Sequence, residues 1–195
     1  MYHAIVRRKL RRAFADINAG RYDGIVAQFA PRHRHAMSGE HALAGERHTP
    51  ASTARWYARL QRLLPGLAFD VRDIVVGGMP WRTVATVTWD DRFTLPDGTA
   101  GANTGVHEFE LRWGRVSSLV IHCDSQRLQR YCERLVACGV AEAGADPIVD
   151  PAGRPFASRA KGPLPRREGW RHAPRGVRTT GFPWGYIKLA RCLPR

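Results

Sequence analysis

A strand-like segment at residues 118–125 ends in side chains that could carry acid–base chemistry. Three apolar residues, two of them β-branched, precede His122, Cys123 and Asp124. His122 and Asp124 are two residues apart, so on a strand their side chains share a face and can be neighbours. In a dry pocket the pKa of a carboxyl group rises towards neutrality, which would let Asp124 act as a base, with His122 nearby to shuttle the proton.

A structural interpretation of the same residues competes with the catalytic one. Asp124 precedes a helical pattern, and a carboxylate at that position can accept hydrogen bonds from the first backbone amides of a helix. His122 can equally be a core imidazole whose nitrogens are hydrogen-bonded. His107 has the same two interpretations, because it shares one face of the strand pattern at 105–113 with Phe109 and Leu111. The sequence leaves these alternatives open.

The remaining polar clusters point less clearly to chemistry. Asp91 follows Asp90 near the end of a strand pattern, where we expect an exposed side chain. His33 and His35 form an HxH pair that would share one face of a strand, but no further ligand at a fixed spacing completes a metal site. We therefore predict no metal and no cofactor.

The elements that must position these residues follow from the hydrophobic periodicity. Apolar residues at helical spacing predict helices over 3–18, 53–64 and 125–139 and a short helix within 22–30, with Thr49 or Ser52 capping the third. Residues 32–37 are expected to be extended and 38–50 to form a loop. Alternating patterns predict strands over 68–78, 81–95, 105–113 and 116–124, joined as an antiparallel meander. Helices followed by a run of strands are typical of an α+β fold.

The charge divides the chain into two parts. The formal net charge is +14 over 195 residues. Residues 1–150 carry 20 basic and 16 acidic residues, whereas 151–195 carry 11 basic residues and a single acidic one, Glu168. We predict one domain at 1–150 and a basic, low-structure C-terminal tail rich in Pro, Gly and Arg at 151–195.

Several protein classes are disfavoured by composition. No apolar run approaches the ~18 residues of a membrane span, and the first residues lack the apolar core of a secretory signal. The four cysteines form no CxxC pair, so we expect free thiols rather than a zinc ribbon. These observations predict a cytoplasmic protein with no membrane partner.

The ordered landmarks of residues 3 to about 140 resemble the SnoaL-like branch of the nuclear transport factor 2-like superfamily. The segments that carry the resemblance are Gly20-Arg21-Tyr22-Asp23-Gly24-Ile25, Leu64-Pro65-Gly66, Gly105-Val106-His107, Trp113-Gly114-Arg115-Val116 and the strand-ending Asp124. The resemblance implies a curved antiparallel sheet wrapped by three to four helices into a cone with an apolar pocket. It also implies a homodimer that pairs through the open face of the sheet.

Two activities of that superfamily fit these residues poorly. Its epoxide hydrolases use an Asp-Arg-Asp relay, but Asp91 and Arg92 are neighbours here and must point to opposite faces of a strand. Its ketosteroid isomerases use a Tyr on the first helix, where this chain has Phe14 and no interior Tyr.

The cone implied by the resemblance would bring aromatic and polar side chains to one pocket. We expect His122, Asp124 and His107 as catalytic groups. The expected lining residues are Trp56, Tyr57, Trp81, Trp89, Phe109, His35 and Met37. Such a lining suits a flat apolar ligand, although the aromatic rings could also simply fill the cone.

Three functions remain open from the sequence. The first is a small-molecule-binding domain, of isomerase or cyclase type, acting on an apolar carbonyl compound. The second is a non-catalytic ligand-binding or dimerisation module. The third is nucleic-acid binding through the tail alone, where arginines accompany Trp170, Phe182, Trp184 and Tyr186. A solvated, non-specific tail is the favoured interpretation.

Overall fold

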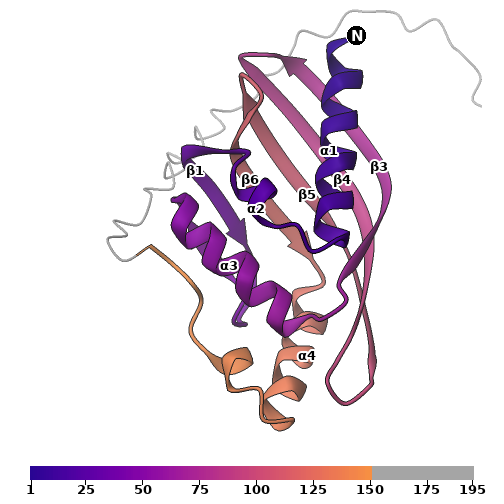
Figure 1. Ribbon diagram of the computed structural model, residues 1–195, viewed down its shortest axis with the longest axis vertical. Helices are drawn as coiled ribbons and strands as arrows, with labels where there is room; N and C mark the ends of the chain where they lie inside the picture. The colour runs from indigo at the N-terminus through magenta and orange to yellow at the C-terminus, as the bar shows by residue number, and fades with distance from the viewer. Residues whose placement is uncertain (151–195) are drawn as a thin grey trace, which may run out of the picture. The chain divides into compact units, whose positions relative to one another are not determined.

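The computed structural model describes residues 1–150 (Figure 1). The predictions for the tail lie outside these residues. The helices are α1 (Tyr2–Asn18), α2 (Asp23–Val26), α3 (Pro50–Leu63), α4 (Ser125–Ala137) and the short 3₁₀ turn η1 (Ala141–Gly144). The strands are β1 (Phe29–Met37), β2 (Gly45–Arg47), β3 (Ala68–Met79), β4 (Arg82–Thr94), β5 (Ala100–Arg112) and β6 (Arg115–Cys123). The predicted α+β class is confirmed.

The six strands form one curved sheet in the order β2-β1-β6-β5-β4-β3. Strands β3 to β6 form the antiparallel meander that the alternating sequence predicts. The sheet continues beyond the meander, because β1 pairs in parallel with β6, His35 lying opposite Leu119. The short β2 then pairs with β1 inside the segment expected to be a loop. Register shifts in β1, β3 and β5–β6 mark irregular pairing of the kind that bends strands.

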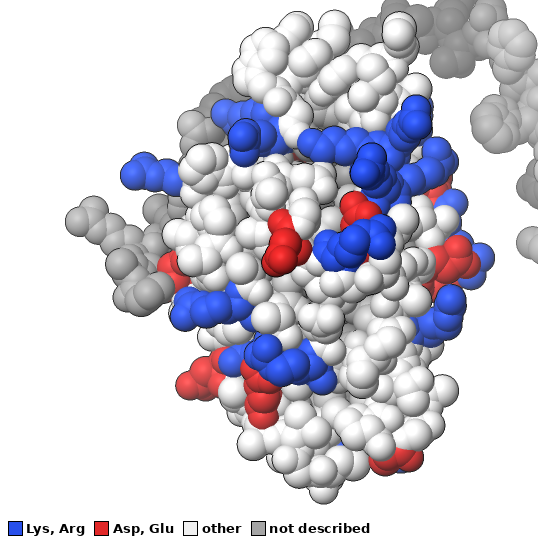
Figure 2. All heavy atoms as spheres, in the orientation of Figure 1, with Lys and Arg blue, Asp and Glu red and all other residues white. Residues whose placement is uncertain are grey.

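Helix α1 presents one apolar stripe to the sheet. Its buried residues are Val6, Leu10, Phe14 and Ile17, whereas Ile5 is exposed. The helix lies against β3, and the Phe14 ring meets Phe69 edge to face at 5.4 Å. Arg8, Arg11 and Arg12 are exposed, whereas Arg7 Nε donates to the backbone oxygen of Ile74 on β3 at 3.2 Å. Figure 2 shows basic side chains over α1 with acidic ones near them.

Helix α3 lies over the sheet next to β1 (Figure 1). Thr49 begins it with a capping box: the Thr49 hydroxyl accepts from the Ser52 amide at 3.2 Å. Pro50 follows in the first turn, where its missing amide proton is not needed. The helix buries Trp56, Tyr57 and Leu60 against the sheet. No helix within residues 1–150 is long and apolar enough to span a membrane.

Candidate functional site

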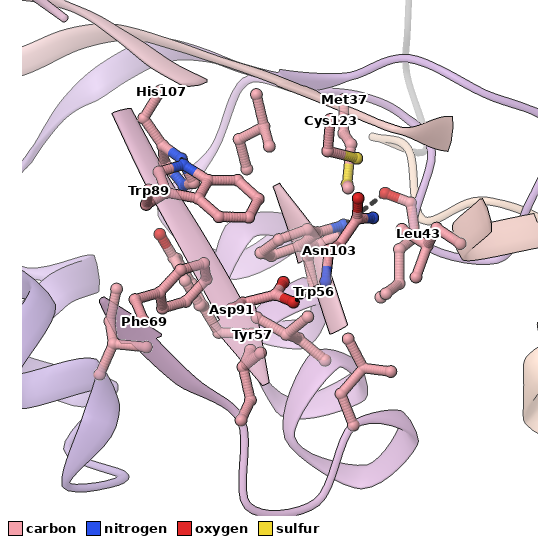
Figure 3. Close-up of a pocket in the computed structure, with 16 residues that line it drawn as sticks. Met37, Leu43, Trp56, Tyr57, Phe69, Trp89, Asp91, Asn103, His107 and Cys123 are labelled. Atoms are coloured by element: carbon pink, nitrogen blue, oxygen red, sulfur yellow. Dashed lines mark hydrogen bonds between the residues drawn. The ribbon is translucent and has the colours of Figure 1, made fainter. Parts of the chain in front are cut away.

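A pocket lies between the concave face of the sheet and helix α3 (Figure 3). Its wall is mostly apolar and aromatic, and its polar members are Asp91, Asn103, His107 and the phenol of Tyr57. The cavity measures about 30 Å³, enough for one or two water molecules. The site is therefore small and mostly apolar, with a few polar groups at fixed places.

Asp91 enters this pocket because of the strand alternation of β4. Trp89 and Phe93, two residues to either side, are buried on the same face. Asp91 Oδ1 accepts a hydrogen bond from the backbone amide of Asn103, its cross-strand partner, at 2.6 Å. Its Oδ2 accepts no hydrogen bond from the described part of the chain. Burial raises the pKa of Asp91 to about 6. The hydrogen bond from the backbone amide of Asn103 opposes this shift, and the nearby charge of Asp90 adds to it.

The side chain of Asn103 lies beside Asp91 in the pocket wall and is held by two hydrogen bonds. Its side chain is 5% exposed. The carboxamide nitrogen donates to the backbone oxygen of Asp124 at 3.2 Å, and the carboxamide oxygen accepts from the Thr104 amide at 2.8 Å. One N–H of the carboxamide remains to donate to a ligand. Figure 3 shows the Asp91 and Asn103 side chains close together in the pocket.

His107 is a neutral imidazole with a fixed tautomer. The indole N–H of Trp89 donates to its Nδ1, so the proton of the ring must be on Nε2. Burial lowers the pKa of His107 to about 3, and His122 adds a smaller effect of the same sign. His107 therefore offers the pocket a hydrogen-bond donor without a positive charge.

The structure brings most of the expected lining residues to one place. Trp56 and Tyr57 from α3, Trp89 from β4 and Met37 from β1 line the pocket with His107. Phe109 lines a second cavity that adjoins it, also of about 30 Å³. His35 is fully buried in the wall next to Trp56 and Tyr57 and lines neither cavity.

The expected position of Trp81 is wrong. Trp81 lies in the turn between β3 and β4, and its side chain is 57% exposed. The alternation of β4 cannot direct it into the pocket because the strand begins only at Arg82. Its ring lies near that of Trp113, in the other hairpin turn, with centroids 6.4 Å apart.

The inward placement of His122 and Asp124 is also wrong. On β6, Leu119 and Ile121 are buried and Cys123 lines the pocket. His122 lies between Ile121 and Cys123, so its side chain points to the outer face of the sheet. There the side chain of His122 is 50% exposed and its Nε2 lies 3.5 Å from Glu108. Asp124 is the N-cap of α4, and its Oδ1 accepts from the amide of Arg127 at 2.9 Å. The polar residues at the end of β6 thus form the junction between this strand and helix α4.

Two substitutions test this assignment. Asp124→Ala is expected to lower the free energy of unfolding by about 1 kcal/mol, since the amide it caps loses its partner. His122→Ala is expected to change it by less than about 0.5 kcal/mol, as exposed ion pairs contribute little. Urea denaturation of both variants measures the difference. A larger loss for His122→Ala than for Asp124→Ala would contradict the placement.

Sequence reasoning missed the carboxylate that does reach the pocket. Asp91 was expected to be exposed, although counting by twos from the aromatic Trp89 would have placed it inward. Asn103 carries no comparable signal, because its position depends on the pairing register between β4 and β5. The HxH pair is engaged otherwise: His33 contacts Ala30 and Thr53, and His35 contacts Arg47. Within residues 1–150, no group of three or more His, Cys, Asp or Glu side chains could hold a metal ion.

The sequence matches the model of a known protein family, and the fold matches solved structures. A family model described as the SnoaL-like domain matches residues 10–119. An NTF2-like protein of unknown function from Burkholderia pseudomallei is 19% identical, with a TM-score of 0.55 over 64% of this chain and 95% of that one. PrhC from Penicillium brasilianum is 13% identical, with a TM-score of 0.57 over 67% and 87%.

A third solved structure is an epoxide hydrolase/cyclase-like enzyme, SalBIII, described with a role in pyran ring formation in the polyether salinomycin. It is 16% identical, with a TM-score of 0.54 over 65% of this chain and 97% of that one. At these identities the likeness establishes the fold, and the predicted cone is confirmed. No curated protein matches the chain.

Proposed function

Because this chain belongs to the SnoaL-like domain family, we propose that it is an acid–base enzyme of isomerase or cyclase type whose general base is Asp91. The substrate is a small apolar carbonyl compound. One observation carries the proposal: a single carboxylate, with a pKa near 6 and one free oxygen, stands in the wall of an otherwise apolar pocket. A base of that pKa is largely ionised at pH 7 and still strong enough to take a proton from carbon.

The reaction begins with proton transfer to Asp91. A carbon next to the carbonyl gives up its proton to Asp91 Oδ2, and the C–H electron pair becomes part of an enolate. The free N–H of Asn103 and the Nε2–H of His107 are the available donors to the developing oxyanion. Protonated Asp91 then returns the proton to another carbon of the same conjugated system. In a cyclisation, the enolate carbon instead attacks a second carbonyl of the molecule, whose oxygen receives that proton.

The apolar wall supports this chemistry by excluding water. Trp56, Trp89 and Phe69 surround the polar groups, so the charge on Asp91 is poorly screened and its basicity is raised. SalBIII gives the fold a cyclase-like example. The epoxide hydrolase relay finds no support here, because Asp91 faces the pocket while Arg92 is exposed on the other side of β4.

Hydrogen–deuterium exchange tests the proposal without knowledge of the natural substrate. 2-Tetralone, an apolar ketone with acidic protons next to its carbonyl, is incubated with the protein in D₂O and followed by NMR. We expect exchange faster than in buffer alone, with a rate that rises with pH through about 6 and then levels off. Saturable binding of the ketone with exchange at the buffer rate would instead favour a non-catalytic ligand-binding module.

A homodimer through the outer face of the sheet remains part of the proposal. The outward residues Val75 on β3 and Val84 on β4 are 60% and 49% exposed, and they give this face apolar area that a second copy could cover. Sedimentation equilibrium of the full chain measures the association. A Val84→Glu substitution is expected to shift it towards the monomer.

A further inference from the structure

Arg47 is a fully buried cation that contacts only neutral acceptors. Its Nε donates to His35 Nδ1 at 2.9 Å, and its two terminal nitrogens donate to the backbone oxygens of Ala44 and Gly45, each at 2.9 Å. The guanidinium lies 5.1 Å from the centre of the Trp56 ring. Among the ion pairs of residues 1–150, none involves Arg47. Burial lowers the pKa of Arg47 to about 10, and the nearby carboxylates of Asp150 and Glu46 oppose this shift, so the buried charge is only partly compensated.

His35 accepts a hydrogen bond from Arg47 at Nδ1 and has an unpaired donor at Nε2. Since Nδ1 accepts from Arg47, the ring proton must be on Nε2. Burial and the charge of Arg47 lower the pKa of His35 well below its usual value, so the ring stays neutral. Its Nε2 is buried and has no hydrogen-bond partner. Such orphaned donors are uncommon in proteins and call for an explanation.

His35 lies among aromatic rings that line the two cavities. Nδ1 and Nε2 lie on opposite sides of the imidazole, so Nε2 projects away from the Arg47 Nε that donates to Nδ1. The surrounding rings are Phe29, Trp56 and Tyr57, with centroids 5.8, 4.5 and 5.6 Å from that of His35. Trp56 lines the Asp91 pocket, Phe29 lines the adjoining cavity, and Tyr57 lines both.

The Tyr57 side chain lies in the walls of both cavities, so a ligand that fills both has to displace it. Each cavity holds about 30 Å³, whereas small-molecule sites typically occupy some hundreds of Å³ (roughly 300 or more). Ile17, Tyr57 and His107 are common to both walls. His107 is held by Trp89, but the Tyr57 hydroxyl makes no hydrogen bond within the described part of the chain. Displacing its ring would therefore cost packing against Tyr22, His35 and Trp56 but no hydrogen bond.

We propose that the ligand is an elongated apolar compound with an oxygen at each end, which displaces Tyr57, joins the two cavities and accepts a hydrogen bond at its far end from His35 Nε2. The near end, at Asp91, rests on the proposed function. In the sheet β1 and β4 are separated by β6 and β5, which is about 14 Å across at ~4.8 Å per strand, and Asp91 lies six residues along β4 from Ala85, the residue in line with His35. His35 and Asp91 must therefore serve different oxygens. The Arg47 charge strengthens the far donor, which suits a ketone, phenolate or enolate oxygen.

The substitution His35→Asn isolates this donor. Asparagine Oδ1 can take the place of Nδ1, so Arg47 keeps an acceptor, while no donor remains at the position of Nε2. Thermal unfolding with and without the substitution shows whether the buried cluster survives. Asp91→Asn is the matched variant at the other end of the ligand.

Two rod-shaped probes that differ in one oxygen test the proposal on the full chain. They are 4,4′-diacetylbiphenyl and 4-acetyl-4′-ethylbiphenyl, with affinity measured by titration calorimetry. We expect the diketone to bind the wild type about tenfold more tightly, as befits one hydrogen bond to a buried donor. This advantage should vanish in His35→Asn and persist in Asp91→Asn. The proton on His35 Nε2 should shift downfield in NMR spectra with the diketone only.

The proposal would be overturned by equal affinity for the two probes, by failure of the wild type to bind either, or by an advantage that survives His35→Asn. An Nε2 proton that stays unchanged under saturating diketone would show that only a buried water serves His35. Failure of the proposed function looks different: the diketone is preferred, but no ketone exchanges its protons. Exchange of 2-tetralone without any preference for the diketone would retain the function and remove the His35 subsite.

Discussion

Asp91→Asn is expected to reduce protein-catalysed deuterium exchange of 2-tetralone by about 10²- to 10⁴-fold, the usual contribution of a general base. Asparagine keeps the shape of the side chain, and its oxygen can still accept from the Asn103 amide. The wild-type rate should follow ionisation of Asp91, falling tenfold per pH unit below about 6. The variant should lose that dependence together with the rate. A variant that retains more than half of the wild-type exchange would exclude Asp91 as the base.

The same substitution has an opposite effect on stability. The pKa of Asp91 is raised by folding, from 3.8 to about 6, so the folded state binds the proton more tightly than the unfolded state. The wild type therefore loses stability as pH rises from about 4 to 6 and is constant in this respect above. Asp91→Asn removes the penalty, and we expect a gain on the order of 2 kcal/mol at pH 7 that disappears near pH 4.

Chemical denaturation of both proteins at the two pH values provides the measurement. A stabilised but inactive variant would be characteristic of a site where function opposes stability. His122→Ala serves as the control, because its side chain lies on the outer face and should leave exchange unchanged. An Asp91→Asn variant that is less stable than the wild type at pH 7 would show that the ionised carboxylate is stabilised by the fold.

Gly105→Ala is expected to destabilise the protein by about 2–3 kcal/mol, the upper range for overpacking. A Cβ at Gly105 would stand 2.3 Å from the backbone oxygen of His122 and 2.6 Å from the Trp89 ring. Neither neighbour can yield freely: one belongs to β6, and the other is the indole that orients His107. The near-UV circular dichroism of the indole should change along with the unfolding midpoint in urea.

Gly24→Ala supplies a matched control for this substitution. Nothing lies within 4 Å of a Cβ at Gly24, which is part of α2. Alanine is favoured over glycine in a helix, so a gain of about 0.5–1 kcal/mol is expected. Equal effects at Gly24 and Gly105 would mean that the close approach of β5 to Trp89 is not maintained in solution.

Local patterns in the sequence determined the elements of this fold. The alternation in β4 and β5 and the helical spacing in α1 and α3 are properties of neighbouring residues, and a strand or helix reports them directly. The caps at Thr49 and Asp124 act over three residues for the same reason. These signals sufficed for the α+β class, the meander and the aromatic wall made by Trp56, Tyr57 and Trp89.

The chemistry of the pocket was decided by contacts between segments far apart in the chain. A shift of one residue turns a side chain to the other face of a sheet. The side of β6 that packs against the core leaves His122 on the outer face, and the side of β4 that packs against the core includes Asp91. The pairing register set Asn103 opposite Asp91. Arg47 met His35 only because β2 joined the edge of the sheet. The sequence by itself thus supplied the walls of the cone, and tertiary packing chose which polar groups face its interior, because burial and register are long-range properties.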